Sequence, residues 1–356
     1  MKAGLIGIGF MGRGHLDQYI RLSYEKSSDD SRENTSENTC DDSRVHLAAI
    51  CDIDGEKFKG VFTPVESNIN VGSKTYDFSP YTLYTDYREM IDKEELDYVD
   101  IALPTYLHCE AAIYALEHGT HVLCEKPMAL DLDECRRMIS AAENSKKTLM
   151  VAQCLRFWPA YEYLKECVAD GRYGKAFCAY FFRGGATPRW SYENWLLRKD
   201  KSGGCLLDQH VHDIDMINYL FGLPKSVFTT AVNVIAGSGW DALSTNYQYD
   251  GLVVNAQDDW NLQGGFGFEM IYRVNFEKAN LTLNSNGVLT VNPNDGSSFA
   301  PDLSSDDGYY REINYFVDCI SNNKPIEIST PSSTMDTIRI ALCERKSAET
   351  GELVNI

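Results

Sequence analysis

An acid and an imidazole lie four residues apart in the stretch 203–215, GGCLLDQHVHDID. Read as one helix, this stretch places Asp208, His212 and Asp215 on a single face and directs His210 to the opposite side. A carboxylate beside a histidine can orient the imidazole for proton transfer. The same pattern also fits a histidine that is satisfied near a helix surface, so the stretch alone leaves catalysis and packing equally open.

A lysine follows the apolar run HVLCE at 121–125, within the sequence CEKP. Strand-like runs alternate with helical patterns in this part of the chain, which predicts a parallel, doubly wound sheet. Ligands bind outside the carboxyl ends of such strands. Pro104, Glu125 and Lys126 all lie at predicted strand ends. We therefore expect them at the same edge of the sheet, the edge formed by the carboxyl ends of the strands, which we call the rim. The alternative for Lys126 is a solvated lysine with no function.

The N-terminal run AGLIGI leads into a glycine pattern of the form GxGxxG, followed by a helix-like segment. Glycines at this spacing permit a tight turn and a close backbone approach to a pyrophosphate, which the helix N-terminus stabilises. The position after a strand and before a helix favours a dinucleotide-phosphate loop over a chance glycine-rich turn. Its residues are Gly7, Gly9, Phe10, Met11 and Gly12.

The acid expected at the end of the second strand is Asp52, 40 residues after Gly12. The usual spacing is about 20 residues. The polar, low-complexity stretch 23–44 accounts for the excess as a surface insertion, an extended helix end or disorder. A carboxylate at Asp52, beside the apolar Ile53 and without a neighbouring arginine, predicts NAD over NADP, because a 2′-phosphate would meet negative charge.

The second half of the chain predicts a different sheet. Residues 176–184 read as its first strand, and 266–276 alternate between apolar and polar side chains, as in a sheet with one buried face. We therefore expect an α/β protein with a Rossmann domain at 1–127 and an α+β domain at 128–356, built on a large, mainly antiparallel open sheet. The second face of that sheet would meet another subunit or solvent.

Composition narrows the class of partner. The 356 residues carry a formal net charge of -19, which argues against a nucleic acid or an anionic membrane. Eleven scattered cysteines without a CxxC pair indicate reduced thiols in the cytoplasm. The N-terminus lacks the features of a signal peptide, and no apolar run approaches the ~20 residues of a membrane span.

The motifs GIGFMG, CEKP and GGxxLxDxxxHxxD, taken in this order, resemble the glucose-fructose oxidoreductase, inositol dehydrogenase and rhizopine-catabolism family (Gfo/Idh/MocA). The resemblance implies that Lys126, Asp208 and His212 line the pocket where substrate meets nicotinamide. It also implies that Pro104, His108 and Glu125 border the cofactor. The chain departs from the pattern at Cys205 and at His210, where the family commonly has glycines. An imidazole at His210 is expected to reach the pocket mouth or a neighbouring subunit.

The activity implied is hydride transfer between NAD and the hydroxyl or keto carbon of a sugar, cyclitol or glycoside, in a dimer or tetramer joined through the C-terminal sheet. Redox-neutral elimination or glycoside cleavage with tightly held NAD is the alternative within the family. A metal hydrolase using the HxH pair and a non-catalytic NAD sensor also compete, although no metal is expected. Candidate substrate contacts are Arg156, Trp158, Trp195 and His210.

Overall fold

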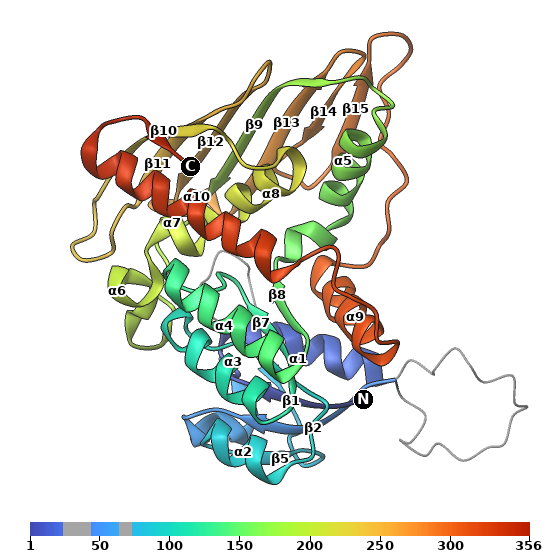
Figure 1. Cartoon of the computed structure of the whole chain (residues 1–356), viewed down its shortest axis with the longest axis vertical. Coiled ribbons are helices and arrows are strands. Elements are labelled where there is room, and N and C mark those ends of the chain that lie inside the picture. The colour runs from blue at the N-terminus through green and yellow to red at the C-terminus, as the bar shows by residue number, and fades with distance from the viewer. Residues whose placement is uncertain (24–43, 64–72) are drawn as a thin grey trace, which may run out of the picture.

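The computed structural model describes residues 1–23, 44–63 and 73–356. Apart from its two end residues, the predicted insertion at 23–44 lies outside the described residues. Two sheets stand one above the other, with helices packed around the first and against one face of the second (Figure 1). Among the residues described, no helix is both long enough and apolar enough to cross a membrane.

The N-terminal sheet is parallel, in the order β5-β2-β1-β6-β7-β8. The strand order reverses at β1, which creates a crevice outside the strand ends on either side of it. Strand β8 lies beyond the predicted domain boundary at 127, so that boundary was wrong for the sheet. The strands are β1 Lys2–Ile6, β2 His46–Cys51, β5 Thr82–Tyr84, β6 Tyr98–Ile101, β7 His121–Glu125 and β8 Leu149–Ala152.

In the described residues, the helices that connect these strands are α1 Phe10–Ser23, α2 Tyr87–Lys93, α3 His108–Glu117 and α4 Leu132–Ser145. Short pieces fill the connection after β2, namely η2 Gly55–Lys59, β3 Val61–Phe62 and β4 Lys74–Thr75. Asp131 caps α4 by accepting the N–H of Glu134, as expected for an acidic residue at this position. Strands that alternate with helices thus confirm the predicted doubly wound half.

The C-terminal sheet has the order β15-β14-β13-β9-β12-β11-β10-β16, and every pair is antiparallel except β9 with β12. This confirms the predicted large, mainly antiparallel sheet, including the strand at 176–184. Its strands are β9 Ala176–Gly184, β10 Ser226–Val232, β11 Ala242–Gln248, β12 Val253–Asp259, β13 Glu269–Phe276, β14 Ala279–Leu283, β15 Leu289–Pro293 and β16 Val354–Asn355.

Helices α5 Pro159–Asp170, α8 Val211–Phe221 and α10 Pro331–Thr350 lie on one face of this sheet (Figure 1). Helix α9, Gly308–Ser321, instead returns to the N-terminal unit and packs beside α1. Its Phe316 is fully buried, with its ring 5.4 Å from that of Tyr98 on β6. The N-terminal unit therefore includes a helix from the far end of the chain.

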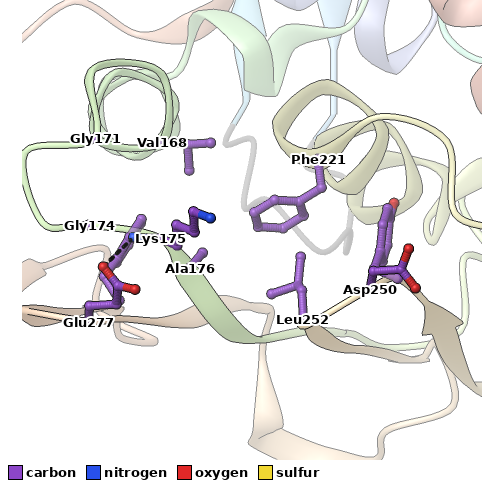
Figure 2. Close-up of a pocket in the computed structure, with 11 residues that line it drawn as sticks. Val168, Gly171, Gly174, Lys175, Ala176, Phe221, Asp250, Leu252 and Glu277 are labelled. Atoms are coloured by element: carbon purple, nitrogen blue, oxygen red, sulfur yellow. Dashed lines mark hydrogen bonds between the residues drawn. The ribbon is translucent and has the colours of Figure 1, made fainter.

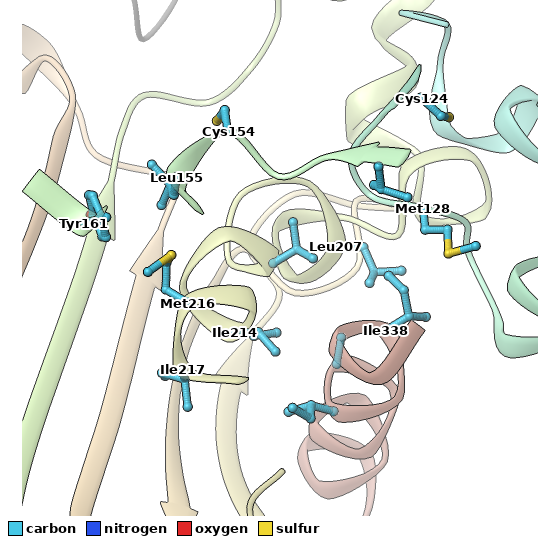
Figure 3. Close-up of a cluster of buried hydrophobic side chains, with 14 of the residues drawn as sticks. Cys124, Met128, Cys154, Leu155, Tyr161, Leu207, Ile214, Met216, Ile217 and Ile338 are labelled. Carbon is cyan, nitrogen blue, oxygen red and sulfur yellow. The ribbon is translucent and has the colours of Figure 1, made fainter. Parts of the chain in front are cut away.

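Of the two apolar cores that the described residues form, one extends through both units. Figure 3 shows Cys124 and Met128, from the β7 end, near Leu207 and Ile338 of the C-terminal unit. All four side chains are completely buried. Because this core is continuous, the strand ends of the first sheet and the segment 205–221 are held in a fixed relation.

The segment predicted as one helix at 203–215 is interrupted. Helix α7, Cys205–Asp208, ends before α8 begins, and the N–H of His210 bonds to the carbonyl of Cys205 at 2.8 Å, five residues back. This wider turn shifts the helical faces, so the single-helix prediction was wrong in detail. Gly203 and Gly204, with φ of 78° and 72°, form the sharp entry that α6, Lys199–Ser202, leads into.

Candidate active site

The glycine loop connects β1 to α1, as predicted. A side chain at Gly12 would place its Cβ 1.8 Å from the carbonyl oxygen of Gly7, so these two glycines are required for close packing. A Cβ at Gly9 would meet nothing within 4 Å. Phe10 and Met11 begin α1, whose first N–H groups have no partner inside the helix. The loop thus packs tightly on one side and is open on the other, which suits a bound pyrophosphate.

Asp52 lies at the end of β2, beside the loop, and its carboxylate is already engaged. One oxygen accepts the N–H of Ile8 at 2.9 Å and the ammonium of Lys57 at 2.7 Å, and the other accepts the N–H of Asp54 at 2.9 Å. The cofactor prediction assumed an unopposed negative charge here. Lys57 corrects that assumption, because it places a cation directly on the acid.

The remaining rim residues follow the strand ends of β6 and β7. Pro104 precedes the short helix η3, Thr105–Leu107. His108, 1% exposed, lies between two backbone carbonyls, with Nδ1 2.9 Å from Pro127 and Nε2 2.7 Å from Leu103. His108 therefore ties the two strand ends together, and neither of its nitrogens is free for the predicted cofactor contact. Glu125 is also buried beneath the rim.

Lys126 and Asp208 meet across the two units. The ammonium of Lys126 donates to the backbone carbonyl of Asp208 at 2.7 Å and lies 3.4 Å from its carboxylate. Both side chains are largely buried, with 13% and 22% of their surface exposed. An ammonium has three donors, so at least one remains for a ligand oxygen. The structure thus brings together two of the three predicted catalytic residues.

His212 lies one turn after Asp208, in the first turn of α8. Burial lowers its pKa well below the ordinary value, and the positive charges of Lys126 and Arg183 lower it further. The imidazole is therefore neutral at pH 7 and able to accept a proton. Within the described part of the chain, Nδ1 of His212 has no hydrogen-bond partner. The predicted orientation of His212 by Asp208 is therefore not seen, since the Asp208 carboxylate faces Lys126.

A loop from the C-terminal unit reaches the glycine loop. The ring of Trp190 lies 6.3 Å from that of Phe10, and the ammonium of Lys201 lies 4.9 Å from the ring of Tyr106, beside Pro104. The segment 185–204 consequently contacts the cofactor side of the rim at two points. Residues from both units therefore contact the rim.

Arg156 and Asp215 do not belong to this rim. The Arg156 guanidinium donates twice to the Asp215 carboxylate, at 2.7 and 2.8 Å, and also to the carbonyl of Ile328 and the hydroxyl of Ser333. Both charged side chains are 1% exposed. The prediction that Arg156 contacts substrate was wrong, because its donors are committed to a buried ion pair that joins η4, Cys154–Phe157, to α8 and α10.

The prediction that His210 reaches the pocket mouth or a neighbouring subunit was also wrong. It has no exposed surface, and its Nε2 lies 3.2 Å from Glu344 of α10, while Nδ1 lies 3.8 Å from Asp258 of β12. The ring therefore faces the C-terminal sheet and reaches neither the pocket mouth nor another subunit. Among the described residues, His210 lies close enough to share a cation with Asp213 and Asp258 but not with His212, so the two histidines do not converge on a shared metal. Asp213 is held by Arg183 at 3.1 Å.

The two tryptophans predicted to contact substrate stay predictions. Trp158 precedes α5, and its indole meets the ring of Tyr309 edge-on at 5.6 Å. Trp195 is half-buried in η5, Tyr192–Leu197. A hollow of about 530 Å³ also exists on the C-terminal unit, between α5 and the strand turns (Figure 2). Lys126, Asp208 and His212 do not line it, so it is separate from the rim.

Two residues that lie beside the predicted site residues were not identified from the sequence. Lys57 follows Asp52 by five residues, and only the turn of η2 brings its ammonium back to the acid. His15, one turn after Gly12, is completely buried and lies 3.0 Å from Glu125. A histidine on the sheet-facing side of α1 could have indicated a buried polar cluster, because apolar residues normally occupy that face.

Comparisons with known proteins agree with this geometry. A family model described as an oxidoreductase family with an NAD-binding Rossmann fold matches residues 1–153, and a GFO/IDH/MocA C-terminal domain model matches residues 161–282. The first match ends just after β8, the last strand of the first sheet along the chain, and the second begins within α5. The class is thus a Rossmann-fold oxidoreductase with an added sheet domain. The chain belongs to the Gfo/Idh/MocA family.

Individual relatives cover less of the chain. Levoglucosan dehydrogenase from Pseudarthrobacter phenanthrenivorans is 35% identical over 172 residues, 45% of this chain and 43% of that protein. A 2,7-anhydro-N-acetylneuraminate hydratase from Mediterraneibacter gnavus is 32% identical over 171 residues, 46% of each chain. The chain thus matches less than half the length of these relatives. In contrast, the solved levoglucosan dehydrogenase complex with NADH and levoglucosan aligns over 100% of this chain and 99% of its own, with a TM-score of 0.81 at 21% identity.

The low pKa of His212 depends in part on the charge of Lys126. We expect Lys126→Met to raise the pKa of His212, because a nearby cation disfavours the protonated imidazole and the variant removes it. NMR titration of the imidazole signal, assigned with His212→Gln, measures the shift. Lys57→Met, at the other end of the glycine loop, is the matched control and should leave the titration unchanged. An unchanged His212 pKa in Lys126→Met would contradict the placement of the two residues.

Proposed function

We propose that this protein is an NAD(P)-dependent dehydrogenase that transfers hydride between a nicotinamide cofactor and a hydroxyl or keto carbon of a sugar, cyclitol or glycoside. The observation that carries the proposal is the contact of Lys126 with Asp208 at 2.7 Å, beside a neutral His212 and on the rim of the glycine loop. It places a cation and a proton acceptor together where the parallel strands end.

His212, Lys126 and Asp208 would each have a separate role in an alcohol oxidation. His212, neutral at pH 7, takes the proton of the substrate hydroxyl. Lys126 donates to the same oxygen and stabilises the negative charge that develops on it. Asp208 holds the Lys126 ammonium and accepts from a neighbouring hydroxyl of the substrate. A bound nicotinamide cofactor would supply the acceptor for the hydride. Ketone reduction uses the same groups in reverse.

We propose NAD as the preferred cofactor, with weaker use of NADP. Asp52 supports NAD because two ribose hydroxyls can donate to its carboxylate. The exposed Ile53, 82% accessible, offers apolar surface next to the acid. Lys57 limits the discrimination, since its ammonium can leave Asp52 for a 2′-phosphate. Arg13, over the ring of Phe62, adds a second cation on this side of the loop.

A redox-neutral reaction is the second candidate. The similarity to a 2,7-anhydro-N-acetylneuraminate hydratase favours it, since the name of that relative describes no net oxidation. In this version the same Lys126, Asp208 and His212 would serve a transient oxidation followed by elimination and re-reduction of the same substrate. The two candidates differ in whether reduced cofactor leaves the protein.

We propose that the open face of the C-terminal sheet joins two or more copies of the chain. The helices cover the face that carries Val227 and Val254, whereas Phe228, Val232 and Val253 point to the opposite face. These three side chains are 37%, 59% and 67% exposed. A wide sheet face with exposed apolar side chains is typical of a protein interface.

The catalytic assignment predicts that His212→Ala and Lys126→Met each lower turnover by about 10²- to 10⁴-fold. Cofactor affinity should stay near the wild-type value, because neither residue belongs to the glycine loop that would bind the pyrophosphate. A screen of sugars, inositols and glycosides with NAD and NADP, followed by reduced-cofactor absorbance, identifies the substrate to use. Lys175→Met, in the separate hollow, is the matched lysine control. Near wild-type turnover in either variant would refute the assignment. NAD retained through purification, with substrate consumed and no reduced cofactor released, would select the redox-neutral candidate.

The cofactor assignment predicts that Lys57→Met weakens NADP binding by roughly tenfold or more, because a hydrogen bond to a charged group is worth about 1.5–3 kcal/mol. NAD binding should stay within about threefold, since Asp52 keeps its acceptors. Titration of both cofactors by calorimetry measures the two affinities. Lys59→Met, which lies on the same short helix and pairs with Glu56, is the matched control. An equal loss for both cofactors would show that Lys57 has no role in discrimination.

The interface assignment predicts a dimer or tetramer at micromolar concentration in analytical ultracentrifugation. Val253→Glu should shift the protein toward monomer, because it places a charge on the open sheet face where the copies would meet. Val61→Glu, on the N-terminal unit and 71% exposed, should leave the assembly unchanged. A monomeric wild-type protein would contradict the interface.

A further inference from the structure

Four ionisable side chains form a buried cluster directly beneath the rim: His15 of α1, Asp100 of β6, Glu125 of β7 and Glu312 of α9. Three of them have no exposed surface, and Glu125 is 4% exposed. We call this set the buried acid cluster. Three carboxyl groups and a single imidazole are costly to bury unless their charges are balanced. How the balance is achieved decides what the cluster does.

His15 bridges two of the acids. Its Nδ1 lies 2.8 Å from a carboxylate oxygen of Asp100, and its Nε2 lies 3.0 Å from one of Glu125. A carboxylate only accepts, so both contacts are hydrogen bonds when both ring nitrogens carry protons. Burial by itself lowers the pKa of His15, but the charges and hydrogen bonds of Asp100 and Glu125 outweigh it and raise the pKa well above its ordinary value. His15 is therefore an imidazolium.

Glu312 reduces the negative charge of the cluster by keeping a proton, although two carboxylates still face the single imidazolium. Within the described residues, neither of its carboxyl oxygens has a hydrogen-bond partner. Burial raises the pKa of Glu312 well above its ordinary value, and the negative charge of Glu125 adds to the shift. His15, Glu125 and Glu312 lie close enough to ligate a cation together. Both nitrogens of His15 are, however, engaged as donors, which leaves no lone pair for a metal.

The cluster connects the cofactor helix to the catalytic lysine. Glu125 accepts from His15 with one oxygen and from the backbone N–H of Lys126 with the other, at 2.9 Å. His15 lies one turn after Gly12, on the helix whose N-terminus faces the phosphate site. A single imidazolium thus links the element predicted to bind the pyrophosphate to the backbone that carries the Lys126 ammonium.

We infer that His15 is a positioning residue, which holds Lys126 in place relative to the bound cofactor through Glu125. The inference rests on the proposed function of Lys126. Without the imidazolium, Glu125 loses its counter-charge and its orientation. The backbone of Lys126 is then free to move, and its ammonium no longer stays on the Asp208 carbonyl.

The test compares His15→Leu with His15→Gln. We expect His15→Leu to lower kcat by up to about 10²-fold, because a misplacement near 1 Å of a catalytic group costs that much. The dissociation constant of the cofactor should change by less than about threefold, since the glycine loop is intact. His15→Gln keeps a donor toward Glu125 and should recover a large part of kcat. Tyr19→Phe is the matched control, because Tyr19 donates to Asp100 at 2.8 Å and does not touch Glu125.

A double variant separates positioning from general damage. In a Lys126→Met background, His15→Leu should cause no further loss, because the lysine it positions is absent. Additive losses, or a kcat in His15→Leu equal to that of wild type, would overturn the inference. If His15→Leu does not fold, the same comparison is made with His15→Gln alone, whose kcat must then lie between the wild-type and Lys126→Met values.

A second measurement does not depend on turnover. Competitive labelling of lysines with acetic anhydride, read by mass spectrometry, reports how accessible the Lys126 amine is. Lys126 should be labelled more readily in His15→Leu than in wild type, while Lys175 is unchanged. Unchanged labelling of Lys126 would overturn the positioning role. An increase in labelling without turnover of any substrate by the wild-type protein would instead indicate that the proposed function is wrong and the linkage right.

Discussion

The Lys126 ammonium on the Asp208 carbonyl joins a strand end of one sheet to a helix that packs on the other, at 2.7 Å. A contact this short between two structural units requires that neither unit move independently. The continuous core of Met128, Leu207 and Ile338 provides that restraint, because a close-packed interior does not deform gradually. The site therefore depends on the shared core as much as on its own polar residues.

Buried charge is the second constraint on this fold. Arg156 with Asp215, Arg183 with Asp213, and His210 with Glu344 all lie in the interior around α8. An unpaired ion in such a place is strongly unfavourable, so each must find its partner. Asp258, whose pKa burial raises to about 7, lies among them. These pairs fix the angle of α8 and thereby the direction in which His212 points.

The chemistry of the site follows from environment more than from residue type. Among four ionisable side chains near the rim, residues of the same type differ in protonation state because their surroundings differ. His212, buried beside cations, is neutral, whereas His15, between two carboxylates, is charged. Glu125 is ionised against His15, and Glu312 keeps its proton. The same residue type can thus be neutral or charged in this site, according to whether cations or carboxylates surround it.

The sequence by itself determined the parts that obey local rules. The glycine loop, Asp52 and the rim position of Lys126 were predictable because a βαβ pattern fixes where strand ends lie. The mainly antiparallel second sheet was predictable because side-chain alternation has a period of two residues. Tertiary structure alone decided the partners of Arg156 and His210, the return of α9, the place of β8 in the first sheet and the cation on Asp52. Each depends on a contact whose partner the local pattern does not specify. Side chains such as Arg156 carry no mark of whether a buried acid 59 residues away or a ligand will neutralise them.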